Sequence, residues 1–450
     1  MEFGPFYEET SVPWEIAGPL IDDFRAKIRE DRGVPAQAPL RTLPSHGEAH
    51  ENVLSALRSL KSLDPAPSGG RLTIYSLQGD DEVQKLCLAA YTEFFKQNAL
   101  LAGAYLRSVS YMEQEVQETA QSLLGGGPRS GSNLTSGGSE SIYCALHAAR
   151  QWARSAKPEI AEPEFVVPWS IHPAFSKGAD ILGIKLVRTM LGDDHRASIA
   201  AIRAAITPNT IGLAGSAPCW PYGLFDDIPG LAALALEHNL WMHTDACVGG
   251  FIAPFVAKTG RPIPPFDLSV PGVRSLSADL HKYGYSAKPN SVILWADASD
   301  QQYHYQIIVS SPTGPYVSQG FAGSRPAGAV ASAWAVMRFL GEEGYVRLAE
   351  KTMSAKEYVE DAMRGMGFDV WKTDVALLVA GHPKHDVRKI VAGMKDRGWA
   401  MMGTPFPPLI HMTFDAVERE ACDPFCSDLR DVVLAVEEGR IAETGALSYV

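Results

Sequence analysis

The sequence contains little that would take the protein to a membrane or onto a nucleic acid. Its 450 residues include 40 Lys and Arg against 52 Asp and Glu, a formal net charge of −12. No block of basic residues interrupts this acidity, so neither nucleic acids nor anionic membrane surfaces are expected as partners. No apolar run approaches the roughly 18 residues that a membrane-spanning helix needs. The acidic start, MEFGPFYEET, also lacks the basic and apolar regions of a signal peptide, so we expect no membrane anchor.

Cysteine is also scarce, with six residues in the whole chain. Only Cys422 and Cys426 lie close together, and no second Cys or His pair completes a zinc site. The segment HGEAH (46–50) does not have the H-E-x-x-H spacing of a metal-binding helix. Few and scattered cysteines are typical of reduced thiols in a cytoplasmic protein. We therefore predict no metal and a cytoplasmic location.

The order of local patterns predicts three parts. Residues 1–75 mix helical stretches with Pro-rich joints such as GVPAQAPLRTLP and are interpreted as an N-terminal arm. Residues 76–325 are predicted to form a large α/β domain, because short apolar runs alternate there with helical patterns. Residues 326–450 begin with a long helical pattern and are predicted to form a smaller α+β C-terminal domain.

The predicted strands define the architecture of the large domain. Their sequences are SNLTSG, EFVVPW, TIGLAGSAP, LWMHTDACVGG, VRSLSADLHK and SVILWAD. Short buried strands that alternate with helices are typical of a mostly parallel sheet covered on both faces. In such sheets ligands bind at the C-terminal ends of the strands, where the loops carry polar side chains.

Polar residues at three of these strand ends suit one cofactor. The run LTSGGSESI (134–142) leads through Gly138 into a helix, and a helix N-terminus with nearby glycines binds anions. Ser139 is expected to cap that helix. Asp245 ends a later strand and Lys282 follows the next one. In this order they suit pyridoxal 5′-phosphate (PLP), whose phosphate would sit in the cradle, whose ring nitrogen would face the carboxylate, and whose aldehyde would form a Schiff base with the lysine.

Two further expectations follow from this assignment. An amine must be neutral to form the imine, and we expect apolar, cation-rich surroundings to lower the pKa of Lys282. His172 lies between the cradle and Asp245 in the sequence, where its flat ring could stack on the pyridine. Taken singly, each residue also fits a structural role, as part of a capped turn, a turn-forming aspartate or a buried histidine. Their order favours the cofactor.

Seven segments of the chain occur in a recognisable order. They are NLTSGGSESI, IHPAFSKGAD, GSAPCWPYGLFDDI, HTDACVGGF, SADLHKYGYSAKPNSVIL, GFAGSRPAG and GWAMMGTPFPPLIHMTF. In this order they resemble the motifs of the sphingosine-1-phosphate lyase branch of the PLP-dependent group II decarboxylases. The resemblance implies the fold type I, aminotransferase-like architecture of PLP-dependent transferases and a homodimer with active sites at the interface. It also implies retro-aldol cleavage of a 2-amino-3-hydroxy compound.

The resemblance also implies roles for individual residues. Lys282 would be the Schiff-base lysine, Asp245 the partner of the pyridinium nitrogen and His172 the stacking ring. The residues implied to contact the cofactor phosphate are Gly138, Ser139 and His281 of one subunit, with Gly323 and Ser324 of the neighbouring subunit.

Three residues are implied at the substrate end, each with an alternative. Tyr75 aligns with a tyrosine near the leaving group, but it also fits a strand-packing aromatic residue. Lys288 matches a lysine near the substrate phosphate, but it also fits a solvated loop. Arg325 fits either a cation for the substrate or a structural clamp.

At three places the chain departs from the pattern of the family. Tyr-His-Gly is replaced by Tyr75-Ser76-Leu77, Asn-Pro-Leu-His by Asn98-Ala99-Leu100-Leu101, and Pro-His-Gly by Pro221-Tyr222-Gly223. The first two changes remove histidines that lie around phosphate groups in the family. A phosphorylated sphingoid base therefore does not follow as the substrate.

Several functions stay open on the sequence alone. The leading hypothesis is a carbon–carbon lyase (an aldehyde-lyase) acting on a small-molecule amine or amino acid. The runner-up is α-decarboxylation of an amino acid, and other PLP reactions such as transamination remain. A PLP-fold protein that only binds a partner would require loss of the lysine or the aspartate, and both are present.

Overall fold

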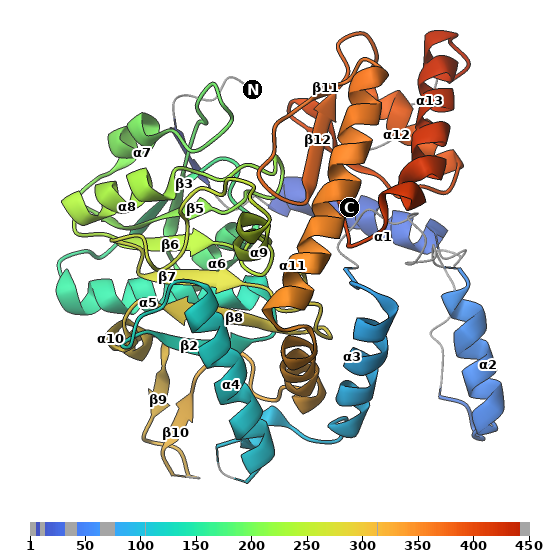
Figure 1. The fold of residues 1–450 in the computed structure, drawn as a ribbon. Helices are drawn as coiled ribbons and strands as arrows, with labels where there is room; N and C mark the ends of the chain where they lie inside the picture. Colours follow the sequence, from blue (N-terminus) through green and yellow to red (C-terminus); the bar gives the residue numbers. More distant parts are fainter. Residues whose placement is uncertain are drawn as a thin grey trace. The chain divides into compact units, whose positions relative to one another are not determined.

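A computed structural model describes residues 6–9, 14–31, 43–63, 77–103, 105–312 and 314–441. Tyr75 and Ser76 lie outside the described residues. Residues Glu9–Ala66 form one unit, which contains helices α1 (Trp14–Asp31) and α2 (His50–Lys61). Met1–Glu8 and Pro67–Val450 form a second unit, which carries all the strands and the remaining helices of Figure 1.

The second unit is built on an eight-stranded sheet with the order β1-β4-β3-β5-β6-β7-β8-β2. The five strands from β4 to β7 pair in parallel, whereas β8 is antiparallel to both of its neighbours. This confirms the predicted mostly parallel sheet. The strands are β1 (Phe6–Glu9), β2 (Gly131–Thr135), β3 (Glu164–Pro168), β4 (Lys185–Thr189), β5 (Thr210–Ser216), β6 (Trp241–Asp245), β7 (Ser275–Ala278) and β8 (Ser291–Trp295).

Helices cover both faces of this sheet because successive strand side chains point to opposite sides. In β3, Val166 packs in a core with α4, α8 and α11, whereas Phe165 and Val167 pack with α5 and α6. The helices up to residue 301 are α3 (Asp81–Glu93), α4 (Arg107–Leu123), α5 (Gly138–Ala156), α6 (Ala174–Leu182), α7 (Ile199–Ala205), α8 (Ile228–Glu237), α9 (Ala253–Lys258) and α10 (Ala298–Gln301).

The C-terminal part has the α+β composition expected of it. Helix α11 (Ala327–Gly365) runs from the large sheet to this part and is interrupted at Gly341, whose φ of 53° favours glycine (Figure 1). A four-stranded antiparallel sheet follows in the order β11-β12-β14-β13, and a separate core packs it against the C-terminal part of α11 and two further helices. These elements are β11 (Asp369–Val370), β12 (Leu377–Gly381), α12 (Val387–Asp396), β13 (Met402–Pro405), β14 (Pro408–Thr413) and α13 (Asp423–Glu437). A hairpin of β9 (Gln306–Ile308) and β10 (Tyr316–Ser318) precedes α11.

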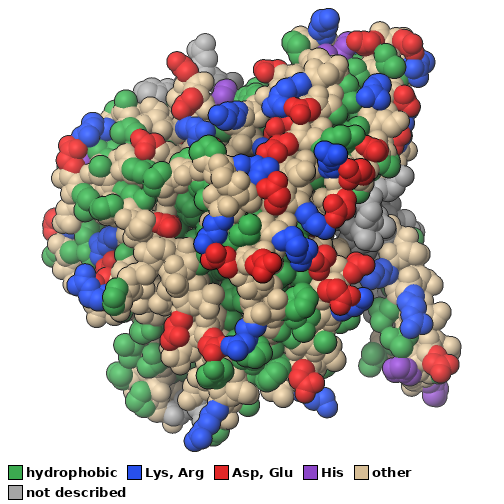
Figure 2. Space-filling view, viewed as in Figure 1, with side chains coloured by type: hydrophobic (Ala, Val, Ile, Leu, Met, Phe, Trp, Pro, Cys, Tyr) green, Lys and Arg blue, Asp and Glu red, His purple; other side chains and the backbone are tan. Residues whose placement is uncertain are grey.

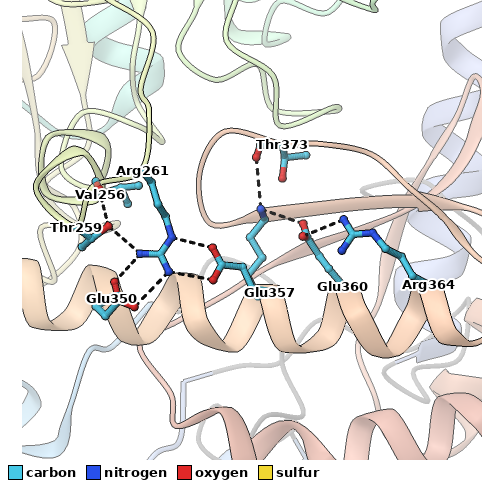
Figure 3. A network of polar contacts seen from close by, with 9 residues as sticks. Val256, Thr259, Arg261, Glu350, Glu357, Glu360, Arg364 and Thr373 are labelled. Carbon is cyan, nitrogen blue, oxygen red and sulfur yellow. Dashed lines mark hydrogen bonds and ion pairs between the residues drawn. The ribbon is translucent and has the colours of Figure 1, made fainter.

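An arginine fastens α11 to the large domain (Figure 3). The guanidinium of Arg261, in the loop after α9, contacts the carboxylates of Glu350 and Glu357, two turns apart on α11. The nitrogen–oxygen distances to Glu357 are 2.7 and 2.9 Å, a two-pronged geometry. The hydroxyl of Thr259 accepts a further hydrogen bond from the same guanidinium at 2.8 Å.

Charged side chains of both signs lie on the visible surface (Figure 2). On the face drawn in Figure 2, acidic and basic side chains are interspersed over the C-terminal helices. Among the described residues, no helix combines the length and the apolar character needed to cross a membrane.

Candidate active site

Predicted site residues from separate segments line one cavity of about 220 Å³. The cavity lies where β6 and β7 end, because parallel strands bring their C-terminal ends to the same sheet edge. The predicted residues in its wall are His172, Asp245, His281, Lys282 and Lys288. Cys247, Trp220, Pro218 and Val248 complete the wall.

Asp245 is the last residue of β6 and is almost fully buried. Its Oδ1 accepts hydrogen bonds from the backbone N–H of Cys247 at 3.1 Å and from the Ser277 hydroxyl at 3.2 Å. The same hydroxyl lies 3.3 Å from Nε2 of His243, a residue whose burial lowers its pKa to about 4. The neutral Ser277 hydroxyl and His243 imidazole therefore form a row of hydrogen bonds that fixes the position of the Asp245 carboxylate.

Lys282 lies in the turn that follows β7. Its Nζ is 2.9 Å from Oδ2 of Asp279, a buried carboxylate three residues earlier. Burial acts to lower the pKa of Lys282, but the charge of Asp279 outweighs it and the pKa is raised above its ordinary value. The expected lowering of this pKa is therefore wrong, because a carboxylate and not a set of cations faces the amine. Asp279 was not among the predicted site residues, although the D-x-x-K spacing in a turn was the available signal.

His172 lies in the loop between β3 and α6. Its Nδ1 accepts a hydrogen bond from the backbone N–H of Ala174 at 3.1 Å. Burial lowers the pKa of His172, and the nearby charge of Asp245 only partly opposes this. The imidazole is therefore neutral at pH 7, with its hydrogen on Nε2.

The predicted anion cradle lies at the start of helix α5. The helix is capped by Gly137, so the expected cap at Ser139 is wrong; Ser139 lies inside the first turn because the chain enters the helix two residues earlier. A side-chain carbon on Gly138 would lie 2.6 Å from the sulfur of Cys247, which is too close. A side-chain carbon on Gly137 would lie 3.7 Å from Cε1 of His281. The N–H groups at the start of α5 that have no partner within the helix therefore lie next to His281, a residue of the cavity wall.

The carboxylate of Glu140, also in the first turn of α5, joins this cradle to a distant loop. Its Oε2 accepts from the backbone N–H of Ser136 at 2.7 Å, and its Oε1 accepts from those of Phe321 and Ala322 at 2.8 and 2.9 Å. Burial acts to raise the pKa of Glu140, but these donors outweigh it and the pKa is lowered. Glu140 is therefore ionised at pH 7 and holds the 320–322 loop at the cradle.

The residues that follow this loop do not enter the cavity of their own chain. Ser324 accepts a hydrogen bond from Asn98 at 2.9 Å, and the guanidinium of Arg325 pairs with Glu113 at 2.7 Å. Gly323, Ser324 and Arg325 are not among the described residues that line the cavity around Lys282. Within one protomer, the contacts of Arg325 are those of a clamp. Lys288, by contrast, lies at the exposed rim of the cavity.

Known proteins are similar to this chain in both sequence and fold. The family described as "Pyridoxal-dependent decarboxylase conserved domain" matches residues 106–377. Over 352 residues the chain is 38% identical to the sphingosine-1-phosphate lyase of Arabidopsis thaliana, a match that covers 76% of this chain and 64% of that protein. Over 358 residues it is 31% identical to a probable L-tyrosine/L-aspartate decarboxylase of Methanothermobacter thermautotrophicus, covering 78% and 95% of the two chains. A solved sphingosine-1-phosphate lyase structure from Burkholderia pseudomallei aligns with a TM-score of 0.85 at 32% identity, covering 90% of this chain and 95% of that one.

Proposed function

Because this chain belongs to the pyridoxal-dependent decarboxylase family and is similar to sphingosine-1-phosphate lyases over most of its length, we propose that it cleaves the C2–C3 bond of a 2-amino-3-hydroxy compound and releases an aldehyde. The chain is a PLP-dependent enzyme of the lyase class. One observation carries the choice of residues: Lys282, Asp245 and His172 line the same cavity, next to the N-terminus of α5.

The described residues fit PLP. The first turn of α5, with Gly138 and Ser139, would hold the phosphate together with His281. Asp245 would keep the ring nitrogen protonated, His172 would stack on the ring, and Lys282 would hold the aldehyde carbon. When bound, PLP accepts the electron pair that is left on carbon after the bond breaks.

The side chains of the cavity prepare this chemistry. Asp279 holds the amine of Lys282 at a fixed place, 2.9 Å away, from which it can exchange protons with a group in the cavity. The chain behind Asp245 keeps its carboxylate from turning away. Cleavage requires the C2–C3 bond to stand perpendicular to the cofactor ring, so residues that orient the substrate select the reaction. We assign Lys288, at the rim, to this orienting role.

We also infer that the protein is a homodimer with active sites at the interface, in which Gly323 and Ser324 serve the neighbouring subunit. Two observations support this. The 320–322 loop that precedes them is fixed beside the cradle by Glu140, yet Gly323 and Ser324 lie outside the cavity of their own chain. Apolar side chains on and beside the nearby β9–β10 hairpin are exposed, including Ile307 (65%), Val309 (75%) and Phe321 (68%) (Figure 2). We further propose a cytoplasmic location, for which the six free thiols are the support.

A second function, α-decarboxylation of an amino acid, is favoured by the 31% identity to a probable decarboxylase over 95% of its length. A panel of amino acids and of 2-amino-3-hydroxy compounds, with and without phosphate, separates the two. Release of an aldehyde without carbon dioxide supports the lyase. Carbon dioxide without an aldehyde would establish the decarboxylase instead.

A further inference from the structure

A second cavity adjoins the active site. It measures about 370 Å³, within the range of roughly 300–1,000 Å³ that is typical of small-molecule sites. Trp220 belongs to the walls of both cavities, so the second begins where the wall of the first ends. Its other walls come from the loop after β3, the 220–222 segment, strand β13 and His411 of strand β14.

The wall of this second cavity carries no side-chain charge. Among the described residues that line it there is no Lys, Arg, Asp or Glu. Aromatic and aliphatic side chains dominate, among them Trp169, Ile171, Trp220 and Met402. An anion placed here would lose its hydration without compensation, whereas an apolar group would gain by leaving water.

Two side-chain polar atoms of residues in this wall lack a partner among the described residues: Oγ of Ser170 and Nε2 of His411. His411 is 3% exposed, and its Nδ1 lies 3.2 Å from the backbone oxygen of Pro221. A carbonyl oxygen can only accept, so the hydrogen of the ring is on Nδ1. Burial lowers the pKa of His411 to about 4, so Nε2 is a neutral acceptor at pH 7. No described residue donates a hydrogen bond to Nε2.

Tyr222 closes the same wall. Its hydroxyl donates a hydrogen bond to the backbone oxygen of Phe406 at 2.6 Å, which joins the 220–222 segment to the turn between β13 and β14. Burial raises the pKa of Tyr222 to about 12, so the hydroxyl keeps its hydrogen at pH 7. Tyr222 is also one of the positions at which the sequence departs from the family pattern, so this wall differs from that pattern.

Resting on the lyase function proposed above, we propose that this cavity receives the group attached to C3 of the substrate, and that Nε2 of His411 accepts a hydrogen bond from that group. The substrate class is then a 2-amino-3-hydroxy compound whose C3 substituent is uncharged, largely apolar or aromatic, and carries one hydroxyl or N–H donor. The shared wall at Trp220 places this substituent next to the amine-binding site.

A matched pair of ligands tests the proposal: 3-phenylserine and 3-(4-hydroxyphenyl)serine, which differ by one hydroxyl. Binding to the PLP-loaded enzyme is followed by the absorbance change of the cofactor, which responds to any amine at Lys282. The wild type is expected to bind the hydroxylated ligand about 2- to 12-fold more tightly, as one net hydrogen bond provides. His411→Phe, which keeps the ring shape, should abolish this preference and change the affinity for 3-phenylserine less than about twofold.

Two further variants keep the test decisive if His411→Phe does not fold. Gly403→Leu, which places a side chain at the wall of the cavity, should weaken both aromatic ligands at least about tenfold and leave threonine, which has only a methyl group at C3, unchanged. His385→Phe changes a histidine of the same domain outside the cavity and should alter nothing. Retention of the hydroxyl preference in His411→Phe, or undiminished aromatic binding in Gly403→Leu, would overturn the proposal.

The same experiment separates this proposal from the function on which it rests. If the ligands bind in the expected pattern but release no aldehyde, the cavity assignment stands and the lyase function fails. If an aldehyde is released but neither variant changes the ligand preference, the lyase function stands and the cavity assignment fails. An absence of any absorbance change with any amine would contradict both.

Discussion

Lys282, in the wall of the candidate active site, forms an ion pair with Asp279, with 2.9 Å between Nζ and Oδ2. The side chain of Asp279 is 3% exposed and that of Lys282 is 18% exposed, so water screens the pair poorly. Burial acts to raise the pKa of Asp279, but Lys282 and His281 outweigh it and the pKa is lowered, while the pKa of Lys282 is raised. Each partner therefore stabilises the charged form of the other.

Asp279→Asn should lower the free energy of unfolding of the cofactor-free protein by about 3 kcal/mol at pH 7, because it leaves an ammonium largely buried without its counter-charge. The difference in free energy of unfolding between the wild type and Asp279→Asn should shrink below about pH 4, where Asp279 becomes protonated as the pH falls toward its lowered pKa. It should also shrink above about pH 10, where the pH approaches the raised pKa of Lys282. Urea unfolding across this pH range measures it. The double variant with Lys282→Met should cost less than Asp279→Asn alone; an equal or larger cost would contradict the pairing.

Lys282→Ala should abolish the covalent attachment of PLP, because no other amine is assigned to the aldehyde. Borohydride reduction followed by digestion and mass spectrometry should place the pyridoxyl label on Lys282 in the wild type and nowhere in the variant. Lys288→Ala, at the rim of the same cavity, should keep the label. A label recovered on another lysine of the wild type would refute the assignment.

Asp245→Asn should reduce kcat by a factor on the order of 10²–10³, since an electrostatic partner of the reacting system is lost while the shape of the side chain is kept. Steady-state kinetics at equal cofactor content gives the number. Ser277→Ala removes one hydrogen bond to the same carboxylate and should cost about tenfold or less. Wild-type kcat in Asp245→Asn would exclude the assigned role.

Arg261→Ala should destabilise the protein by about 1–2 kcal/mol, because one guanidinium joins two carboxylates of α11 to the large domain (Figure 3). The carboxylates are about half exposed, so the loss should shrink at high salt. Denaturant unfolding at low and high salt measures both effects. Arg364→Ala, whose more exposed side chain pairs within α11, is the control and should cost less than 1 kcal/mol, about the value of an exposed pair.

The sequence predicted β2, β3, β5, β6, β7 and β8 because each is a short, fully buried run bounded by turn residues, whereas β1 and β4 were not among the predicted strands. It also predicted that Asp245 and Lys282 meet, because parallel strands end at one edge and this follows from topology alone. Two local details were wrong. The N-cap of α5 is Gly137, which has no capping side chain, and not Ser139. The amine of Lys282 faces Asp279 because of the shape of a turn, which no periodic pattern of residues encodes.

The second cavity was beyond sequence reasoning for a different reason. His411 meets the backbone of Pro221 across 190 positions of the chain, and although both residues lie in segments that resemble the family's motifs, neither was predicted as a site residue. Only the folded arrangement shows that Nε2 of His411 has no donor among the described residues and that Trp220 separates the two cavities. The roles of Gly323 and Ser324 depend on a second subunit and stay predictions.

The carboxylate of Glu140 connects two segments that the proposed homodimer would use at different sites. One of its carboxylate oxygens accepts from the turn that we propose binds phosphate, and the other accepts from the loop leading to Gly323 and Ser324. In the proposed homodimer, phosphate bound at the start of α5 in one subunit would stabilise the 320–322 loop of that subunit through Glu140. The residues that follow this loop, Gly323 and Ser324, would complete the site of the other subunit. Binding at one site and order at the other are then thermodynamically linked, and linkage is reciprocal. Loading of the apoenzyme with PLP should therefore be cooperative, and Glu140→Gln, which weakens both connections, should make the two sites fill independently.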